Sequence, residues 1–227
     1  MEVMIRHNPA FSVGRVALAG GEGVRVESGA MMATSDGVQI EAKMEGGLLK
    51  SLKRAALGGE SLFITTYTAP PAGGWVDVAA NLPGDLIVAP VSPEQPINVT
   101  KGSWICSSAG VELDTKWGGF KSAFGGEGGF LIHAGGQGTI VMSCYGALDT
   151  IQLGPGERVV IDSGHTVAYS SDVQMTLRKA TGGAIQSLKS GEGLVFEFTG
   201  PGWVMAQSRN PSALVAWLTQ VLPFSRQ

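Results

Sequence analysis

One series of short sequence phrases occurs three times along the chain, always in the same order. The first phrase sets a glycine and a carboxylate before an extended apolar run, at Gly21-Glu22, Gly84-Asp85 and Gly156-Glu157. The second phrase covers residues 28–33, 101–106 and 163–168, and the last is Gly74-Trp75-Val76, Gly138-Thr139-Ile140 or Gly202-Trp203-Val204. Such ordered recurrence predicts one structural unit used three times, over residues 21–83, 84–155 and 156–210.

The apolar runs inside each unit have the two-residue period of β-strands. Val24 and Val26 flank a polar residue, as do Val111 and Leu113. The 34 glycines and 11 prolines are spread along the chain, which is typical of turns between many short strands. We therefore expect a single all-β domain over residues 1–227, in which the three units stack or close around a pseudo-threefold axis.

Two segments depart from the β pattern. Residues 48–57 contain good helix formers ahead of Gly58, so one or two helical turns are expected there. After Pro211, Ser212 can cap a C-terminal helix of about residues 212–222 whose apolar side chains fall at helical spacing. We expect this apolar stripe to cover the core of the body, and contact with a membrane or a partner is the alternative.

Charged residues make up only 15% of the chain, against about 25% in an average soluble domain. So few charges suggest that part of the surface is buried between subunits, and we expect a homo-oligomer. The net charge of −3 gives no electrostatic reason to expect a nucleic-acid partner. Lys50, Lys53 and Arg54 form the one local basic cluster, which leaves a weak contact with a membrane surface as an alternative.

The two cysteines, Cys106 and Cys144, lie in different units and have no close-spaced second ligand. This arrangement predicts neither a disulfide framework nor a zinc site, and their small or apolar neighbours are typical of buried thiols. Residues 1–10 lack the apolar core of a signal peptide, and no stretch of about 18 apolar residues occurs. We expect a cytoplasmic protein that carries no cofactor.

Several longer strings resemble one known family. They include residues 51–63, 82–85, 111–119, 162–168 and 207–211, among them Asp162-Ser163-Gly164-His165 and Gln207-Ser208-Arg209-Asn210-Pro211. Together they are similar to the altered-inheritance-of-mitochondria protein 24 family over about residues 20–218. The resemblance implies a fold like that of the tryptophan RNA-binding attenuation protein, a double-stranded β-helix or β-sandwich. Bacterial members of that family have no assigned activity, so the resemblance implies none here. Fungal relatives help to organise the mitochondrial inner membrane.

Asp162 and His165 are the first candidates for a functional site, because they match the Asp-x-Gly-His phrase of that family. Ala30 and Ser103 stand at the place of His165 in the other two units, so any role would belong to the third unit alone. A hydrogen-bonded histidine at a turn is the alternative interpretation. His133 lies in a strand-like run and is interpreted as structural.

Glu60, Glu127 and Glu192 are the second set of candidates, because each follows a glycine at the same place in its unit. A threefold arrangement could bring the three carboxylates together, where they would bind a hard cation or raise one another's pKa values. The alternative is that each glutamate accepts hydrogen bonds from turn amides. The identity of any metal stays open.

These observations favour a non-enzymatic β-rich scaffold or binding protein that associates with itself through strand edges or apolar faces. No catalytic residue is assigned. Two alternatives stay open: a small-ligand or metal-binding protein or enzyme that uses His165, Asp162 or the three glutamates, and a peripheral membrane-associated organiser.

Overall fold

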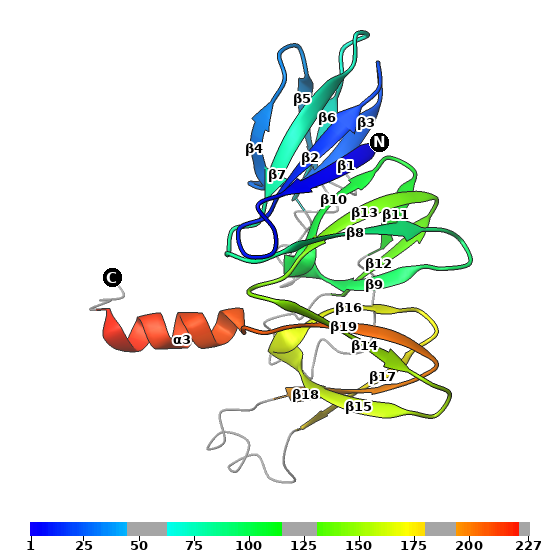
Figure 1. Ribbon diagram of the computed structural model, residues 1–227, viewed down its shortest axis with the longest axis vertical. Helices are drawn as coiled ribbons and strands as arrows, with labels where there is room; N and C mark the ends of the chain where they lie inside the picture. Colours follow the sequence, from blue (N-terminus) through cyan, green and yellow to red (C-terminus); the bar gives the residue numbers. More distant parts are fainter. Residues whose placement is uncertain (45–62, 115–130, 180–193, 223–227) are drawn as a thin grey trace.

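The computed structural model describes residues 1–44, 63–114, 131–179 and 194–222 (Figure 1). Antiparallel strands form most of this part of the chain, and a single α-helix follows them at the C-terminal end. The expected all-β class with one C-terminal helix is confirmed. The helical turns expected at residues 48–57 lie outside the described residues.

Six strands form the unit that is used three times. The first unit contains β2 (Val13–Leu18), β3 (Gly23–Glu27), β4 (Met31–Thr34), β5 (Gln39–Met44), β6 (Phe63–Thr68) and β7 (Gly74–Ala79). The second contains β8 (Leu86–Val91), β9 (Ile97–Thr100), β10 (Trp104–Ser108), β11 (Val111–Asp114), β12 (Leu131–Gly136) and β13 (Gly138–Ser143). The third contains β14 (Leu148–Leu153), β15 (Arg158–Asp162), β16 (Thr166–Ser170), β17 (Gln174–Lys179), β18 (Leu194–Thr199) and β19 (Gly202–Gln207).

Strand pairing within a unit follows one rule in all three cases. The sixth strand lies between the first and the third, and the fifth lies between the second and the fourth. Each unit thus contributes two three-stranded sheets. One extra strand, β1 (Glu2–Arg6), extends the first sheet by pairing with β2.

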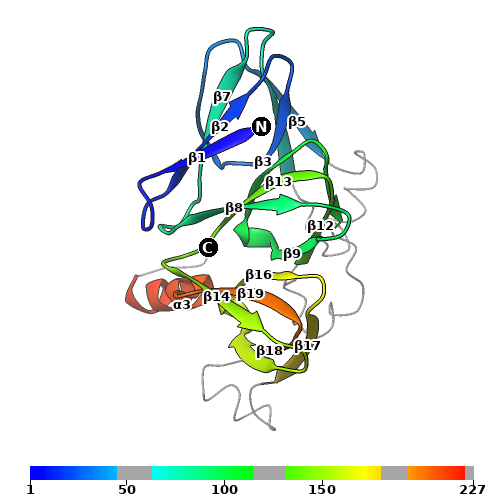
Figure 2. The same cartoon turned by 45° about the vertical axis from the view of Figure 1, so that its right-hand side comes forward.

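The units are joined through sheets that they share. The second strand of one unit pairs with the third strand of the next, so β3 pairs with β10 and β9 pairs with β16. These two joints create six-stranded sheets in the orders β5-β6-β3-β10-β13-β8 and β11-β12-β9-β16-β19-β14. A four-stranded sheet, β1-β2-β7-β4, and a three-stranded sheet, β15-β18-β17, stand at the two ends. The units therefore form an open stack (Figures 1 and 2). Strand β4 lies near one end of the stack and β15 at the other (Figure 1).

Three apolar cores lie between the four successive sheets. Val24 of β3 and Val76 of β7 belong to the first core, and Trp104 of β10 and Ile132 of β12 belong to the second. Phe196 and Phe198 of β18 belong to the third. Because alternate residues of a strand point to opposite faces, each six-stranded sheet buries apolar side chains on both faces.

A serine–glycine pair fixes the third strand against the sixth in every unit. The serine after the third strand, or at its end, accepts a hydrogen bond from the backbone N–H of the second residue of the sixth strand. The distances are 3.0 Å for Ser35 Oγ to Trp75 N, 2.9 Å for Ser108 Oγ to Thr139 N, and 3.1 Å for Ser170 Oγ to Trp203 N. A Cβ on Gly138 or Gly202, both at positive φ, would overlap the serine hydroxyl. The glycine that begins the last recurrent sequence phrase therefore leaves space for this serine.

The first recurrent phrase is equivalent in only two of the units. Gly21-Glu22 and Gly156-Glu157 precede the second strands, β3 and β15, whereas Gly84-Asp85 precedes β8, a first strand. The interpretation that aligned all three was therefore wrong for the middle unit, where Pro96 precedes the second strand, β9. In sequence alone, any glycine and carboxylate before an apolar run look alike, because both turns need the same backbone and acceptor chemistry.

The C-terminal helix, α3 (Pro211–Val221), departs from expectation in two ways. Its N-cap is Asn210, whose side chain accepts from the backbone N–H of Ser212, so Ser212 is not the cap. None of its residues is buried, and the helix extends away from the stack (Figure 1). The expectation that its apolar side chains cover the core was wrong, because the shared sheets already bury the core.

Candidate functional site

Asp162 and His165 lie together where the third unit ends and α3 begins. Asp162 ends β15, and the short 3-10 helix η2 (Ser163–His165) follows it. Oδ1 of Asp162 accepts hydrogen bonds from Gly164 N at 2.9 Å and from Nδ2 of Asn210 at 3.2 Å. The carboxylate therefore caps η2 and also holds the residue that caps α3.

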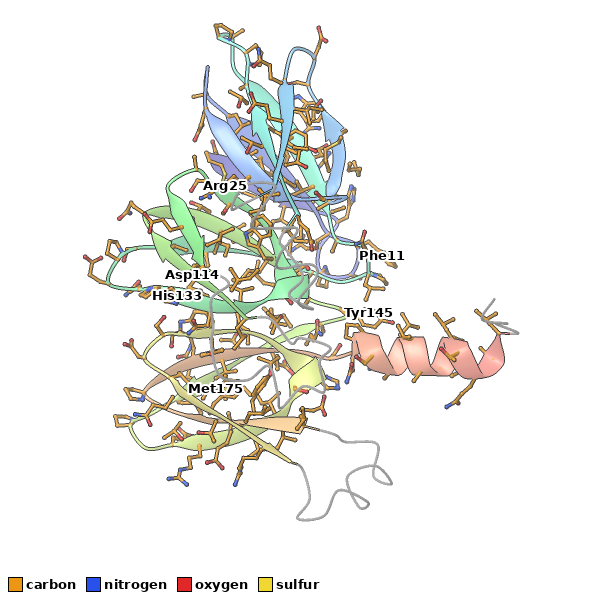
Figure 3. The ribbon with its side chains drawn as sticks, turned by 180° about the vertical axis from the view of Figure 1, so that it is seen from behind. Phe11, Arg25, Asp114, His133, Tyr145 and Met175 are labelled. Carbon is orange, nitrogen blue, oxygen red and sulfur yellow. The ribbon has the colours of Figure 1, made fainter. Side chains whose placement is uncertain are left out.

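His165 contacts the same junction through the end of β19. Its Nδ1 lies 2.7 Å from the carbonyl oxygen of Gln207, and a carbonyl only accepts, so Nδ1 carries the proton. The Gln207 side chain donates to Gly164 O at 2.9 Å and accepts from Tyr145 N at 2.7 Å. Tyr145 lies close to the first turn of α3 (Figure 3). These bonds connect the chain between the second and third units to the segment that leads into the helix.

The hydrogen bonds of this junction, which are mainly to backbone groups, leave little for acid–base chemistry. A nucleophilic site would need a base that is hydrogen-bonded to a hydroxyl or thiol and oriented by a third group. The hydrogen bonds of His165 and Asp162 instead hold backbone and a helix cap. The geometry supports the interpretation of His165 as a hydrogen-bonded turn histidine.

Glu60, Glu127 and Glu192 lie outside the described residues, so their convergence stays a prediction. Among the residues that the structure describes, no group of three His, Cys, Asp or Glu side chains could hold a metal ion.

Other carboxylates accept hydrogen bonds at turns. Glu22 accepts from Ala19 N, and Glu157 accepts from Gly154 N, both at 2.9 Å. Asp85 accepts from Ser12 Oγ at 2.7 Å and from Leu86 N at 2.8 Å, which joins the segment before β2 to the segment before β8. The pKa of Glu22 is lowered by its bonds to the N-terminal ammonium group and to Ala19.

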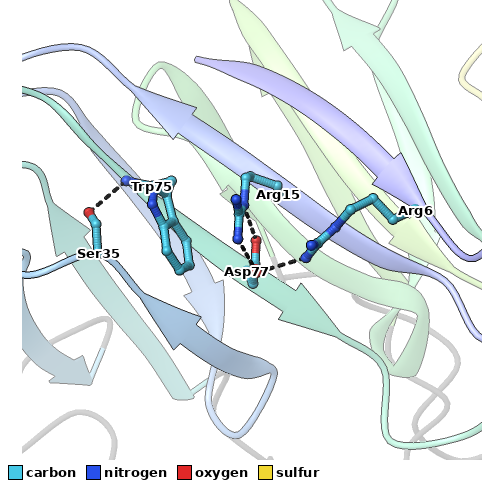
Figure 4. Close-up of polar contacts among 5 residues, drawn as sticks. All are labelled: Arg6, Arg15, Ser35, Trp75 and Asp77. Atoms are coloured by element: carbon cyan, nitrogen blue, oxygen red, sulfur yellow. Dashed lines mark hydrogen bonds and ion pairs between the residues drawn. The ribbon is translucent and has the colours of Figure 1, made fainter.

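A buried charge cluster in the first unit was not predicted from the sequence. Asp77 of β7 is buried on the outer face of the end sheet, where it accepts from Arg6 at 2.7 Å and from Nε and Nη2 of Arg15 at 2.8 Å each (Figure 4). The Arg15 guanidinium also lies 3.9 Å from the ring centroid of Trp75. These hydrogen bonds, that from Arg15 first, lower the pKa of Asp77. No sequence signal was available, because Asp77 lies more than 60 residues after Arg6 and Arg15, which are on the consecutive strands β1 and β2.

His133 and the cysteines have structural surroundings. His133 Nδ1 lies 3.0 Å from Oδ1 of Asn98 on the neighbouring strand β9. Cys106 and Cys144 are buried and free of disulfides, which confirms the prediction of buried thiols. Burial raises the pKa of Cys106 to about 12 and also raises the pKa of Cys144, so neither is a thiolate at neutral pH.

An apolar groove crosses the joint between the second and third units. Its walls come from β8, from the turn before β9, from the turn between β16 and β17, and from the start of β19, and they include Ile87, Gln95, Asp172, Trp203 and Met205. Asp172 is the one titratable side chain in its described lining, beside the polar Gln95, Ser170 and Ser171, and the rest of the lining is apolar. No described helix is long and apolar enough to cross a membrane.

Fold and site together define a class of protein: an open stack of three β units, with its polar cluster at a helix junction. The family model described as "Mitochondrial biogenesis AIM24" matches residues 3–209, so the chain belongs to this family. It is similar to the "Uncharacterized protein M6_Spy0233" of Streptococcus pyogenes serotype M6, with 28% identity over 99% of this chain and 92% of that protein. It is also similar to the crystal structure of protein SPYM3_0169 from Streptococcus pyogenes, with a TM-score of 0.82 and 25% identity over 97% of this chain and 99% of the other.

Proposed function

We propose that this protein is a non-enzymatic β scaffold that associates with itself. The observation that carries the proposal is the contrast between the joints and the ends of the stack. Inside the chain, the second strands β3 and β9 pair with the third strands of the next unit. At the ends, the third strand β4 and the second strand β15 are the outermost strands of their described sheets.

An open strand edge is a surface for association, because it presents unpaired backbone N–H and C=O groups. Proteins that stay monomeric commonly protect such edges with lysines, prolines or bulges that turn the edge away. Neither β4 nor β15 contains a lysine or a proline, and both edges carry apolar side chains that are exposed, Met32 and Val160. The irregularity in β4 between Met31 and Ala33 does not prevent pairing, because β10 and β16 have the same irregularity and are paired on both sides. The low proportion of charged residues supports the same proposal.

The molar mass of the unmodified chain across a wide concentration range tests this proposal. Light scattering coupled to gel filtration should give a mass above that of one chain that rises with concentration. A single-chain mass throughout, up to concentrations of about 1 mM, would contradict self-association.

A second candidate function is peripheral membrane association, which the exposed face of α3 favours. Val215, Trp217 and Val221 are exposed, and the helix contains no charged residue. Apolar side chains of this kind can insert into the boundary between lipid headgroups and acyl chains. Flotation with vesicles of mixed zwitterionic and anionic lipids tests this candidate, with Trp217→Ser as the variant that should lose binding. Equal flotation of both proteins, or flotation of neither, would contradict it.

A further inference from the structure

We infer that two copies of this chain join head to tail: β15 of one copy pairs with β4 of the next and repeats the joint that the chain uses twice internally. The inference rests on the proposed self-association, and it names the partner, the direction and the register of the contact.

The third strands β4, β10 and β16 share one local geometry, which makes them interchangeable at a joint. Each pairs with its sixth strand through a single irregularity: between Met31 and Ala33 in β4, between Trp104 and Cys106 in β10, and between Thr166 and Ala168 in β16. Each is also held by the serine described above. The free strand β4 therefore already has the shape of the two strands that are paired.

The residue at this irregularity gives the strongest evidence that β4 lacks a neighbour. Ile105 and Val167 occupy the position in the two internal joints, and their side chains are 2% and 0% exposed. Ile105 belongs to the core of the first unit and Val167 to that of the second, so each inserts into the core of the unit before its own. Met32 occupies the same position in β4 and is 56% exposed. In a head-to-tail pair, Met32 would insert into the core of the third unit of the preceding copy.

The register follows from the two internal joints. Cys106, Ser107 and Ser108 oppose Val26, Arg25 and Val24, just as Ala168, Tyr169 and Ser170 oppose Val99, Asn98 and Ile97. Transferred to the ends, this register sets Ala33, Thr34 and Ser35 of one copy opposite Ile161, Val160 and Val159 of another. The exposed Val160 then faces Thr34 across the new joint.

One position further along, the same register brings opposite charges together. In the joint between the second and third units this position holds Ser171 and Pro96, and both Ser171 N and Ser171 Oγ donate to Pro96 O, at 3.3 and 2.9 Å. The equivalents at the ends are Asp36, which is exposed, and Arg158, whose side chain is 69% exposed. Within the described part of its own chain Arg158 has only a long contact, with Nη1 4.0 Å from Oε1 of Glu197. Directly opposed residues of antiparallel strands have Cβ atoms about 5 Å apart, so the carboxylate and the guanidinium can form an ion pair.

This joint differs from a symmetric dimer in a way that can be measured. Each copy offers one β4 edge and one β15 edge, so a copy that has joined at one end is still open at the other. Contacts of this kind produce longer assemblies until a ring closes.

Charge exchange between Asp36 and Arg158 is the decisive experiment, with molar mass from light scattering as the measurement. Asp36→Lys alone and Arg158→Glu alone each set like charges opposite one another, and each should weaken association roughly 3- to 30-fold. The double variant Asp36→Lys/Arg158→Glu should recover the unmodified mass. An equimolar mixture of the two single variants should recover it as well, since every joint in the mixture can then pair opposite charges.

Met32→Glu provides a second test, because it sets a carboxylate where the joint requires an apolar side chain. It should weaken association roughly 10- to 100-fold without unfolding the chain, since Met32 is exposed in the single copy. Met4→Glu is the matched control: Met4 is 55% exposed on β1, away from the joint, and its replacement should leave the mass unchanged.

The outcomes separate the inference from the function on which it rests. If the unmodified chain has the mass of one copy at all concentrations, both fail. If it associates, but the two charge reversals and Met32→Glu leave the mass unchanged, self-association stands and the head-to-tail joint is overturned. Association of fixed twofold mass that is equally weakened in the double charge variant would also overturn the joint.

Discussion

The interior of the stack and its two ends contain equivalent strands, but these strands are buried to different extents. The two six-stranded sheets have apolar side chains packed on both faces, so Trp104, Ile105 and Val167 are almost fully buried. The end sheets are packed on one face only, and Met4, Met32 and Val160 are exposed there. The comparison shows that a unit of this kind is completed by its neighbours, so the last unit at each end retains surface that a further unit would cover.

The largest difference in the free energy of unfolding is expected between substitutions of a buried tryptophan and of an exposed one. Trp104→Ala removes a side chain that is 0% exposed in the central core, and it should lower the free energy of unfolding by about 3–5 kcal/mol. Trp217→Ala, at a site that is 58% exposed on α3, should lower it by less than about 0.5 kcal/mol. Urea denaturation monitored by far-ultraviolet circular dichroism measures both, and equal losses would contradict the division between interior and periphery.

A glycine of the serine–glycine pair should be the next most sensitive position. Gly202→Ala combines an unfavourable positive φ with a Cβ that displaces Ser170, and it should cost about 1–3 kcal/mol. Gly102→Ala is the control, because a Cβ there would meet no atom within 4 Å. If thermal unfolding shifts equally in the two variants, the pair does not fix the sixth strand.

The end sheet that carries β4 should depend on pH through Asp77. Because the pKa of this carboxyl is lowered in the folded state, it contributes stability above its ordinary pKa of about 3.9, and this contribution is lost as the pH falls through the lowered value. Asp77→Asn should therefore cost roughly 1–3 kcal/mol at pH 7 and should flatten the loss of stability below about pH 4. Denaturation midpoints from pH 2 to pH 7 test this.

Asp149→Asn is the matched control for this measurement, since Asp149 is exposed on β14. It should leave both the stability at pH 7 and the slope in acid close to those of the unmodified chain. An acid slope that is identical in the Asp77 variant and the unmodified chain would contradict the role of the ion pairs.

The smallest effect should occur at the other end, at the junction of α3. Asn210→Ala removes the helix cap and the bond to Asp162, and should destabilise the helix by about 1 kcal/mol. Because α3 buries no residue, global unfolding should change little, while amide exchange within residues 211–221 should become faster. Faster exchange across β15 and β18 as well would show that the junction supports the third unit rather than the helix alone.

Local patterns in the sequence predicted the parts of the fold that depend on single strands and turns. Alternating residues such as Val24 and Val26 predicted strands, and the recurrent Gly-Trp-Val or Gly-Thr-Ile phrase marked the true start of each sixth strand. The joints between units could not be predicted in the same way. Strand β3 pairs with β10, which follows it by about 80 residues, and neither strand has a sequence pattern that is specific to the other.

The candidate site was predictable in its members but not in its role. Asp162 and His165 do lie at one junction, as their shared phrase suggested, yet their partners Gln207 and Asn210 come from more than 40 residues further along. The Asp77 cluster was missed because Arg6, Arg15 and Asp77 meet only once β1, β2 and β7 pair side by side. In both places the contacts form only because the sheets bring together residues that are distant in the sequence.

Residue-resolved hydrogen–deuterium exchange at two protein concentrations tests the comparison most directly. In dilute protein we predict fast exchange in segments 31–35 and 158–162 and slow exchange in the internal third strands, 104–108 and 166–170. Both end segments should become strongly protected once the protein is concentrated. If the end segments are as slow as the internal ones at the lowest concentration, or stay fast at the highest, the account of an incomplete stack is contradicted.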